Sequence, residues 1–163
     1  MILDNVVKLF KLTREDIFDQ ERLLFGDFMD GNIEETRPYK IIGDLPSMVA
    51  KIEEYLEDFN SATKSPMRLV MFLDACEHVV RICRILRQPL GNALLLGVGG
   101  SGRQSLCKLA TSISSYALFQ IEVVKGYSMK DWRENLKTCL LAAGTKQRQT
   151  TFLFVDTQII NEQ

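Results

Sequence analysis

A glycine-rich stretch in the second half of the chain has the residue types and the spacing of a phosphate-binding loop. Residues 92–106 read NALLLGVGGSGRQSL, with four glycines between positions 97 and 102. Glycine accepts positive φ angles, so such a turn can aim several backbone N–H groups at one anion, and a following helix adds the positive end of its dipole. The stretch predicts a nucleotide-phosphate loop. A tight strand-to-helix turn without a ligand is the alternative that the pattern leaves open.

Two positions depart from the usual phosphate-loop pattern G-x-x-x-x-G-K-[ST]. Arg103 stands where the pattern has lysine, and Gln104 stands where it has a hydroxyl residue that touches Mg²⁺. Arginine keeps a positive charge with a different reach, whereas a glutamine amide oxygen is a neutral metal ligand. Ser105 is rotated by ~100° about the helix and does not simply replace that hydroxyl. The expected nucleotide contacts are Gly97, Val98, Gly99, Gly100, Ser101, Gly102, Arg103, Gln104 and Ser105.

A second chemical feature is the apolar run TFLFVDTQ at positions 151–158. Asp156 follows this run as the acid of a Walker-B site would, where it can hold the water shell of Mg²⁺. The next residue is Thr157, and a threonine hydroxyl is no general base at neutral pH. We therefore expect Asp156 and Gln104 to serve as metal ligands, no catalytic residue, and inefficient hydrolysis. On its own, Asp156 also suits a turn or helix cap.

Alternating patterns around these residues predict an α/β fold. Apolar runs at Ala93–Leu96, Ala117–Val124 and Thr151–Val155 suit strands, and residues 103–115 and 129–143 have helical spacing. Strands that alternate with helices form a parallel sheet, whose ligands bind at the carboxyl ends of the strands. The loop and Asp156 should therefore lie at one edge of the sheet. Ser128 and Asp131 have the spacing of a capping box for the second helix.

The first half of the chain reads as mostly helical. Helical spacing covers residues 47–60 and 65–86, with Ser47 and Ser65 as expected N-caps, and shorter helices are expected over residues 2–12 and from Thr13. Glycines, prolines and mixed charge between them indicate a connector with a short extended piece at residues 39–42. We expect a domain boundary near residue 43.

Composition argues against binding driven by bulk charge. The 163 residues carry 20 basic and 21 acidic side chains, and no apolar run approaches the ~20 residues that a bilayer-spanning helix needs. Neither nucleic acid nor membrane is an expected partner. The cysteines Cys76, Cys83, Cys107 and Cys139 lack metal-site spacing and read as reduced core residues of a cytoplasmic protein.

The segments LLLGVGGSGRQSLCKLATSISSY, YSMKDWRENLK and FLFVDTQII together resemble the fourth AAA+ module of axonemal dynein heavy chains. The upstream FDQERLLFGDFM resembles the end of the third module. The resemblance implies an incomplete P-loop NTPase (AAA+) fold, a parallel three-layer α/β sandwich preceded by a mostly helical segment. Residues 1–43 would end the preceding module and include a linker. Residues 44–163 would be the N-terminal part of the nucleotide-binding domain, with Walker A at 97–105 and Walker B at 152–157.

The same resemblance implies a place in a ring of six modules that moves along microtubules. The bound group would be ATP or ADP, with or without Mg²⁺, held in a regulatory or structural role. Implied partners are the other AAA+ modules of the same chain, dynein intermediate and light chains, and microtubules, in the cytoskeleton of the ciliary or flagellar axoneme. The sheet strand between the loop strand and the Walker-B strand is expected after Gln163, which would leave a gap in the sheet.

Two other readings stay open. One is a structural spacer whose loop holds nothing. The other is a stand-alone P-loop ATPase or kinase, which would need a catalytic base and a closed sheet.

Overall fold

The computed structural model describes residues 8–9, 11, 23–30 and 37–159. Its elements follow the order β1 (Leu24–Gly26), β2 (Lys40–Ile42), α3 (Leu45–Ala62), α4 (Leu73–Arg87), α5 (Arg103–Ile113), β3 (Ala117–Gln120), α6 (Met129–Gly144), β4 (Thr150–Leu153) and the 3₁₀ turn η1 (Asp156–Gln158). The helices expected over residues 2–12 and from Thr13 lie largely outside the described residues. None of the helices in the described ranges is long and apolar enough to cross a bilayer.

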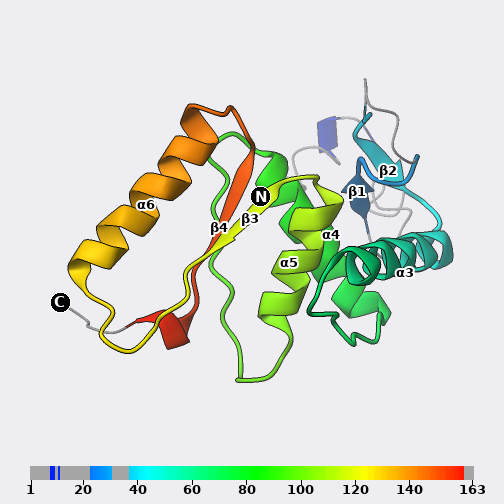
Figure 1. Cartoon of the computed structure of the whole chain (residues 1–163). Coiled ribbons are helices and arrows are strands. Elements are labelled where there is room, and N and C mark those ends of the chain that lie inside the picture. The colour runs from blue at the N-terminus through cyan, green and yellow to red at the C-terminus, as the bar shows by residue number, and fades with distance from the viewer. Residues whose placement is uncertain (1–7, 10, 12–22, 31–36, 160–163) are drawn as a thin grey trace.

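A small parallel sheet lies between helices (Figure 1). Strands β3 and β4 pair in parallel, with Ala117 opposite Thr150 and Gln120 opposite Leu153. Helix α6 packs against one face of this pair and α5 against the other, while α3 and α4 pack beyond α5. This arrangement of helix, sheet and helix confirms the expected incomplete α/β fold.

The main core lies among α3, α4, α5 and the antiparallel pair β1–β2. Its completely buried side chains include Met48 and Ile52 from α3, Val79 from α4 and Leu109 from α5. Phe28 follows β1 and belongs to the same core cluster. Residues on both sides of position 43 therefore share one core, and the domain boundary near that position stays a prediction.

The two upstream helices begin at other residues than the sequence suggested. Helix α3 is capped by Asp44 and not by Ser47, because the Asp44 carboxylate accepts a hydrogen bond from the Ser47 amide at 3.4 Å. Helix α4 begins at Leu73 and not near Ser65. The Asn60 side chain accepts a hydrogen bond from the Met67 amide at 2.7 Å and donates one to the Met67 carbonyl at 2.9 Å. The backbone of Met67 is therefore not available for the hydrogen bonds of a helix.

The first expected strand, Ala93–Leu96, does not form in the structure. A strand needs a neighbour to satisfy its backbone groups, and within the described ranges the parallel ladder joins only β3 and β4. Leu94 and Leu96 are 85% and 82% exposed, although both are large apolar side chains. Among the described residues, no strand therefore pairs with the segment that enters the glycine loop.

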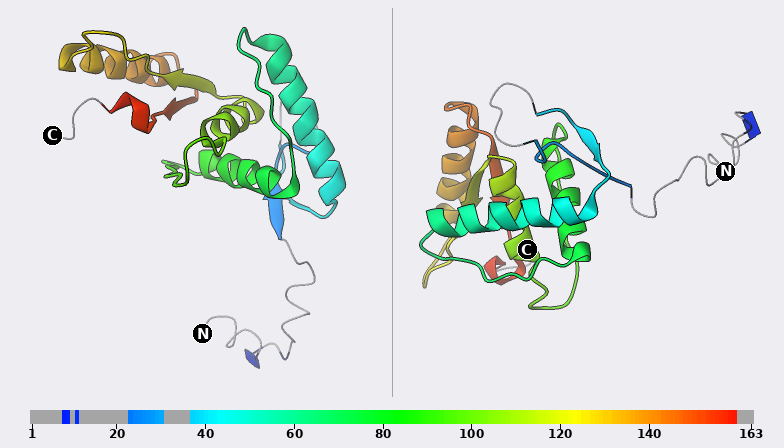
Figure 2. Two further views of the ribbon diagram at one scale, coloured as in Figure 1. Left: turned by 90° about the horizontal axis from the view of Figure 1, so that it is seen from below. Right: turned by 90° about the vertical axis from the view of Figure 1, so that its right-hand side faces the viewer.

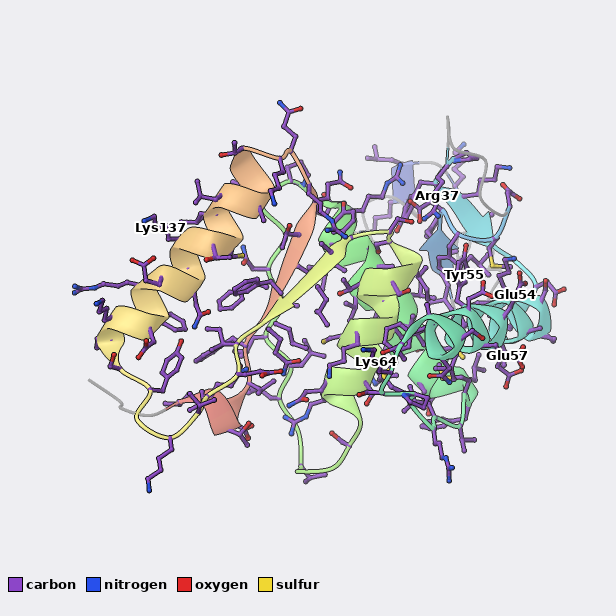
Figure 3. The ribbon with its side chains drawn as sticks, viewed as in Figure 1. Arg37, Glu54, Tyr55, Glu57, Lys64 and Lys137 are labelled. Carbon is purple, nitrogen blue, oxygen red and sulfur yellow. The ribbon has the colours of Figure 1, made fainter. Side chains whose placement is uncertain are left out.

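Helix α6 begins where its capping box predicts. The Ser128 hydroxyl accepts from the Asp131 amide, and the Asp131 carboxylate accepts from the Ser128 amide at 2.8 Å. The Ser128 hydroxyl also donates to the Asp131 carboxylate at 2.6 Å, and this bond, together with the one from the Ser128 amide, lowers the pKa of the Asp131 carboxyl below its ordinary value. Figure 3 shows Lys137 on the outer face of this helix, pointing away from the sheet.

Candidate functional site

The glycine loop runs directly into the first turn of α5. Gly100 and Gly102 adopt φ angles of +77° and +76°, in the left-handed region that favours glycine. Gly102 is the N-cap of α5. Because glycine has no side chain, the amides of the first turn donate no hydrogen bond to a capping side chain there. An anion bound at a helix N-terminus would accept hydrogen bonds from those amides.

The space around the loop is open. A Cβ atom added at Gly99, Gly100 or Gly102 would meet no heavy atom within 4 Å. Packing within the described chain therefore does not require glycine at these positions. The loop thus combines left-handed glycines with open space around them.

Arg103 lies across the entrance of the loop. Its guanidinium donates to two carbonyl oxygens of the preceding segment, from Nη1 to Leu95 at 3.3 Å and from Nη2 to Val98 at 3.0 Å. The Arg103 Cδ and Nε atoms lie 3.6 Å from the place where a Gly97 Cβ would be. The side chain thus folds back on the loop. Gln104 is exposed and Ser105 is half-buried.

The expected Walker-B acid lies in the turn η1 that follows β4. Asp156 is exposed, and its Oδ1 accepts from the amide of the neighbouring Thr157 at 2.9 Å. Gln158 was missed by sequence reasoning, although it fixes this turn. Its side chain accepts from the Val155 amide at 2.9 Å and donates to the Ile121 carbonyl after β3. Gln158 therefore ties the carboxyl ends of the two strands together.

The glycine loop and η1 lie at the same end of the molecule (Figures 1 and 2), as parallel strands require. The carboxylate of Asp156 and the amide oxygen of Gln104 are the oxygen ligands that Mg²⁺ accepts, but only one of them is charged. The described part of the chain holds no group of three or more His, Cys, Asp or Glu that could bind a metal ion. A magnesium ion here would take its remaining ligands from phosphate oxygens and water.

The cysteines lie outside this site. Cys76, Cys83 and Cys107 are buried and Cys139 is half-buried, all as free thiols. Burial raises the pKa of the Cys76 thiol to about 11 and that of Cys83 to about 12. These thiols remain protonated near neutral pH and are poor nucleophiles. Cys76, Cys83 and Cys107 belong to the buried core, as expected, whereas Cys139 lies outside the core cluster.

A contact from the upstream segment reaches the far end of the site helix. Arg37 donates from Nη1 to the carbonyl of Ile113, the last residue of α5, at 2.8 Å, and from Nη2 to Ser115 Oγ at 3.3 Å. Figure 3 places Arg37 beside the β1–β2 pair. A cation at a helix C-terminus is favourable because the last carbonyls carry partial negative charge. No sequence pattern indicated this contact, because the partners are 76 residues apart.

Comparison with known proteins agrees with this geometry. Residues 67–163 match the family model described as the P-loop containing dynein motor region D4. The chain is 46% identical over 161 residues to dynein axonemal heavy chain 1 of Mus musculus and 47% identical over 152 residues to dynein axonemal heavy chain 3 of Mus musculus. It is 42% identical over 164 residues to dynein axonemal heavy chain 2 of Homo sapiens.

These alignments cover 99%, 93% and 99% of this chain and 4% of each relative. The chain thus spans a small part of the length of the heavy chains it matches. The resemblance to axonemal dynein heavy chains is confirmed by these identities. Since the family model matches more than half of its residues, the chain belongs to the family of the P-loop containing dynein motor region D4.

Proposed function

We propose that this segment holds ATP or ADP within a ciliary motor chain, at a site that hydrolyses nucleotide poorly. The observation that carries the proposal is the open glycine loop at the N-terminus of α5. The left-handed φ angles of Gly100 and Gly102 shape it, and a Cβ added at either glycine would meet no heavy atom within 4 Å. Backbone amides of residues 97–105 and the dipole of α5 would hold the phosphates.

Magnesium would be held by few protein oxygens. Gln104 and Asp156 supply an amide oxygen and a carboxylate, and both side chains are exposed at the end of the molecule where the loop lies. When bound, the ion would neutralise charge on the phosphates. With one charged ligand in the set, the protein itself contributes little to metal affinity, which favours nucleotide binding with loosely held metal.

Poor hydrolysis follows from the residue after Asp156. Thr157 is exposed, and its amide donates to the Asp156 carboxylate. Its neutral hydroxyl is too weak a base to take a proton from an attacking water near neutral pH. A site that holds phosphates without a base suits a regulatory or structural role.

The wider role rests on the axonemal relatives. We propose that the parent motor works in the cytoskeleton of cilia and flagella, with the other AAA+ modules of the same chain, intermediate and light chains, and microtubules as its partners. Neither nucleic acid nor membrane is among the proposed partners.

The test uses a complete heavy chain that carries this segment and in which the other nucleotide loops are disabled. We expect one equivalent of retained ATP or ADP per chain and no turnover above that of the chain with this loop also disabled. Absence of any bound nucleotide would refute the proposal and favour the structural spacer with an empty loop. Turnover at this site would instead favour an active P-loop ATPase.

A further inference from the structure

We propose that Arg103 is a positioning residue that latches the glycine loop to the segment before it, and that it does not bind the nucleotide phosphates. The inference rests on the proposed nucleotide site. It concerns how the loop keeps its shape before any ligand arrives. It also gives the arginine at the usual lysine position a role that differs from the one expected of a phosphate-binding cation.

The latch is built from the fork geometry of the guanidinium. Two of its nitrogens reach carbonyls three residues apart, those of Leu95 and Val98, which stand on either side of Gly97. A guanidinium presents several donors in one plane, whereas a lysine ammonium is a compact point charge at the end of a flexible stem. One arginine can therefore clamp both carbonyls at once.

The clamp acts on a segment that pairs with no strand among the described residues. Residues 93–96 carry no sheet ladder among the described residues, and Leu94 and Leu96 are largely exposed. The Leu95 carbonyl thus receives from Arg103 a hydrogen bond that a neighbouring strand supplies elsewhere in a sheet. Since Arg103 is the first residue of α5, the clamp joins the loop entrance to the helix that follows the loop.

The same contacts turn the guanidinium away from a phosphate role. The side chain folds back on Gly97, with Cδ and Nε 3.6 Å from the place where a Cβ would be. To reach a phosphate, the Arg103 guanidinium would have to break its hydrogen bonds to the carbonyls of Leu95 and Val98. These are the two hydrogen bonds that join the loop entrance to α5, so a phosphate contact by Arg103 would open the clamp. We infer that phosphates are held by loop amides while the clamp stays closed.

The experiment compares Arg103→Lys and Arg103→Gln in a complete heavy chain that carries this segment. The matched controls are Arg148→Lys and Arg148→Gln, at an exposed arginine that precedes β4 at the opposite end of the sheet. Amide hydrogen exchange is measured without nucleotide. We expect both Arg103 variants to speed exchange in the first turn of α5, where the Leu106 amide donates to the Gly102 carbonyl at 2.9 Å, about tenfold, the effect of losing one charge-assisted hydrogen bond, and both controls to leave it unchanged.

Nucleotide affinity supplies a second readout. If Arg103 acts through the loop, both variants weaken ATP, ADP and AMP binding by a common factor, and the positive charge of lysine gives no rescue. Wild-type exchange in Arg103→Lys, or an affinity loss that grows with the number of phosphates, would overturn the latch. A wild-type chain without bound nucleotide would refute the proposed function, while hydrogen exchange would still decide the latch.

Discussion

Alanine substitutions at two glycines with similar φ angles can separate the effect of backbone strain from the effect on nucleotide binding. Gly102 in the loop has a φ of +76°, and Gly126 in the turn between β3 and α6 has a φ of +84°. A Cβ at either position would meet no heavy atom within 4 Å. Alanine at either site therefore costs only the left-handed backbone penalty of about 1–2 kcal/mol, without a steric clash.

The two variants should differ in nucleotide binding. At Gly102 the added methyl group enters the open space beside the amides of the first turn of α5, which is where we propose that the phosphates lie. If the methyl displaces one phosphate oxygen from its N–H donor, about 1.5–3 kcal/mol of binding is lost, which is a factor of roughly 10–100. At Gly126 no such loss follows, because no proposed ligand contact lies there.

The assay joins two measurements on a complete heavy chain that carries the segment. Amide hydrogen exchange around positions 102 and 126 reports the local strain, and it should rise by a similar factor in Gly102→Ala and Gly126→Ala. Titration with ATP, with the other nucleotide loops disabled, reports occupancy. Equal ATP affinity in the two variants would show that the phosphates do not lie against Gly102, and the reasoning from the loop's shape would then be wrong.

Three further outcomes follow from other contacts. Arg37→Gln should loosen the last turn of α5 by about 1 kcal/mol, since it removes the charged donor to Ile113, and exchange of residues 110–115 will show it. Alkylation at pH 8 should modify Cys139 before Cys83 in mass spectra, because burial raises the pKa of Cys83 to about 12. Asp131, whose pKa is lowered, stabilises α6 above about pH 4 and loses this effect as pH falls through its folded pKa. Asp131→Asn should therefore flatten the acid dependence of α6 exchange.

Features set by neighbouring residues could be predicted from the sequence. The start of α5 at Arg103 follows from the glycines before it, and the start of α6 follows from Ser128 and Asp131. Both depend on residues within four positions of each other. The parallel pairing of β3 and β4, which places the loop and η1 at one end, also follows from the alternation of strands and helices.

Features set by distant contacts could not be predicted. Helix α4 begins later than predicted because the Asn60 side chain hydrogen-bonds the backbone of Met67. The cap pattern at Ser65 is local and does not predict that contact. The run 93–96 has the composition of a strand, but a strand also requires a partner's backbone. For the site, residue types indicated which side chains are present, while the direction of Arg103 and the role of Gln158 depend on where backbone carbonyls lie.

Helix α5 is held at both ends by arginines, and this explains how a loop with an unpaired entrance keeps a defined position. Arg103 joins the first turn to the carbonyls of Leu95 and Val98, and Arg37 joins the last carbonyl to the upstream segment. Between them the buried side chains of Leu106, Leu109 and Ile113 pack into the core. Because that core includes residues before position 43, a displacement of the upstream segment would bear directly on the helix that begins the candidate site. Among the described residues, the loop is thus positioned by α5 and by the core into which that helix packs.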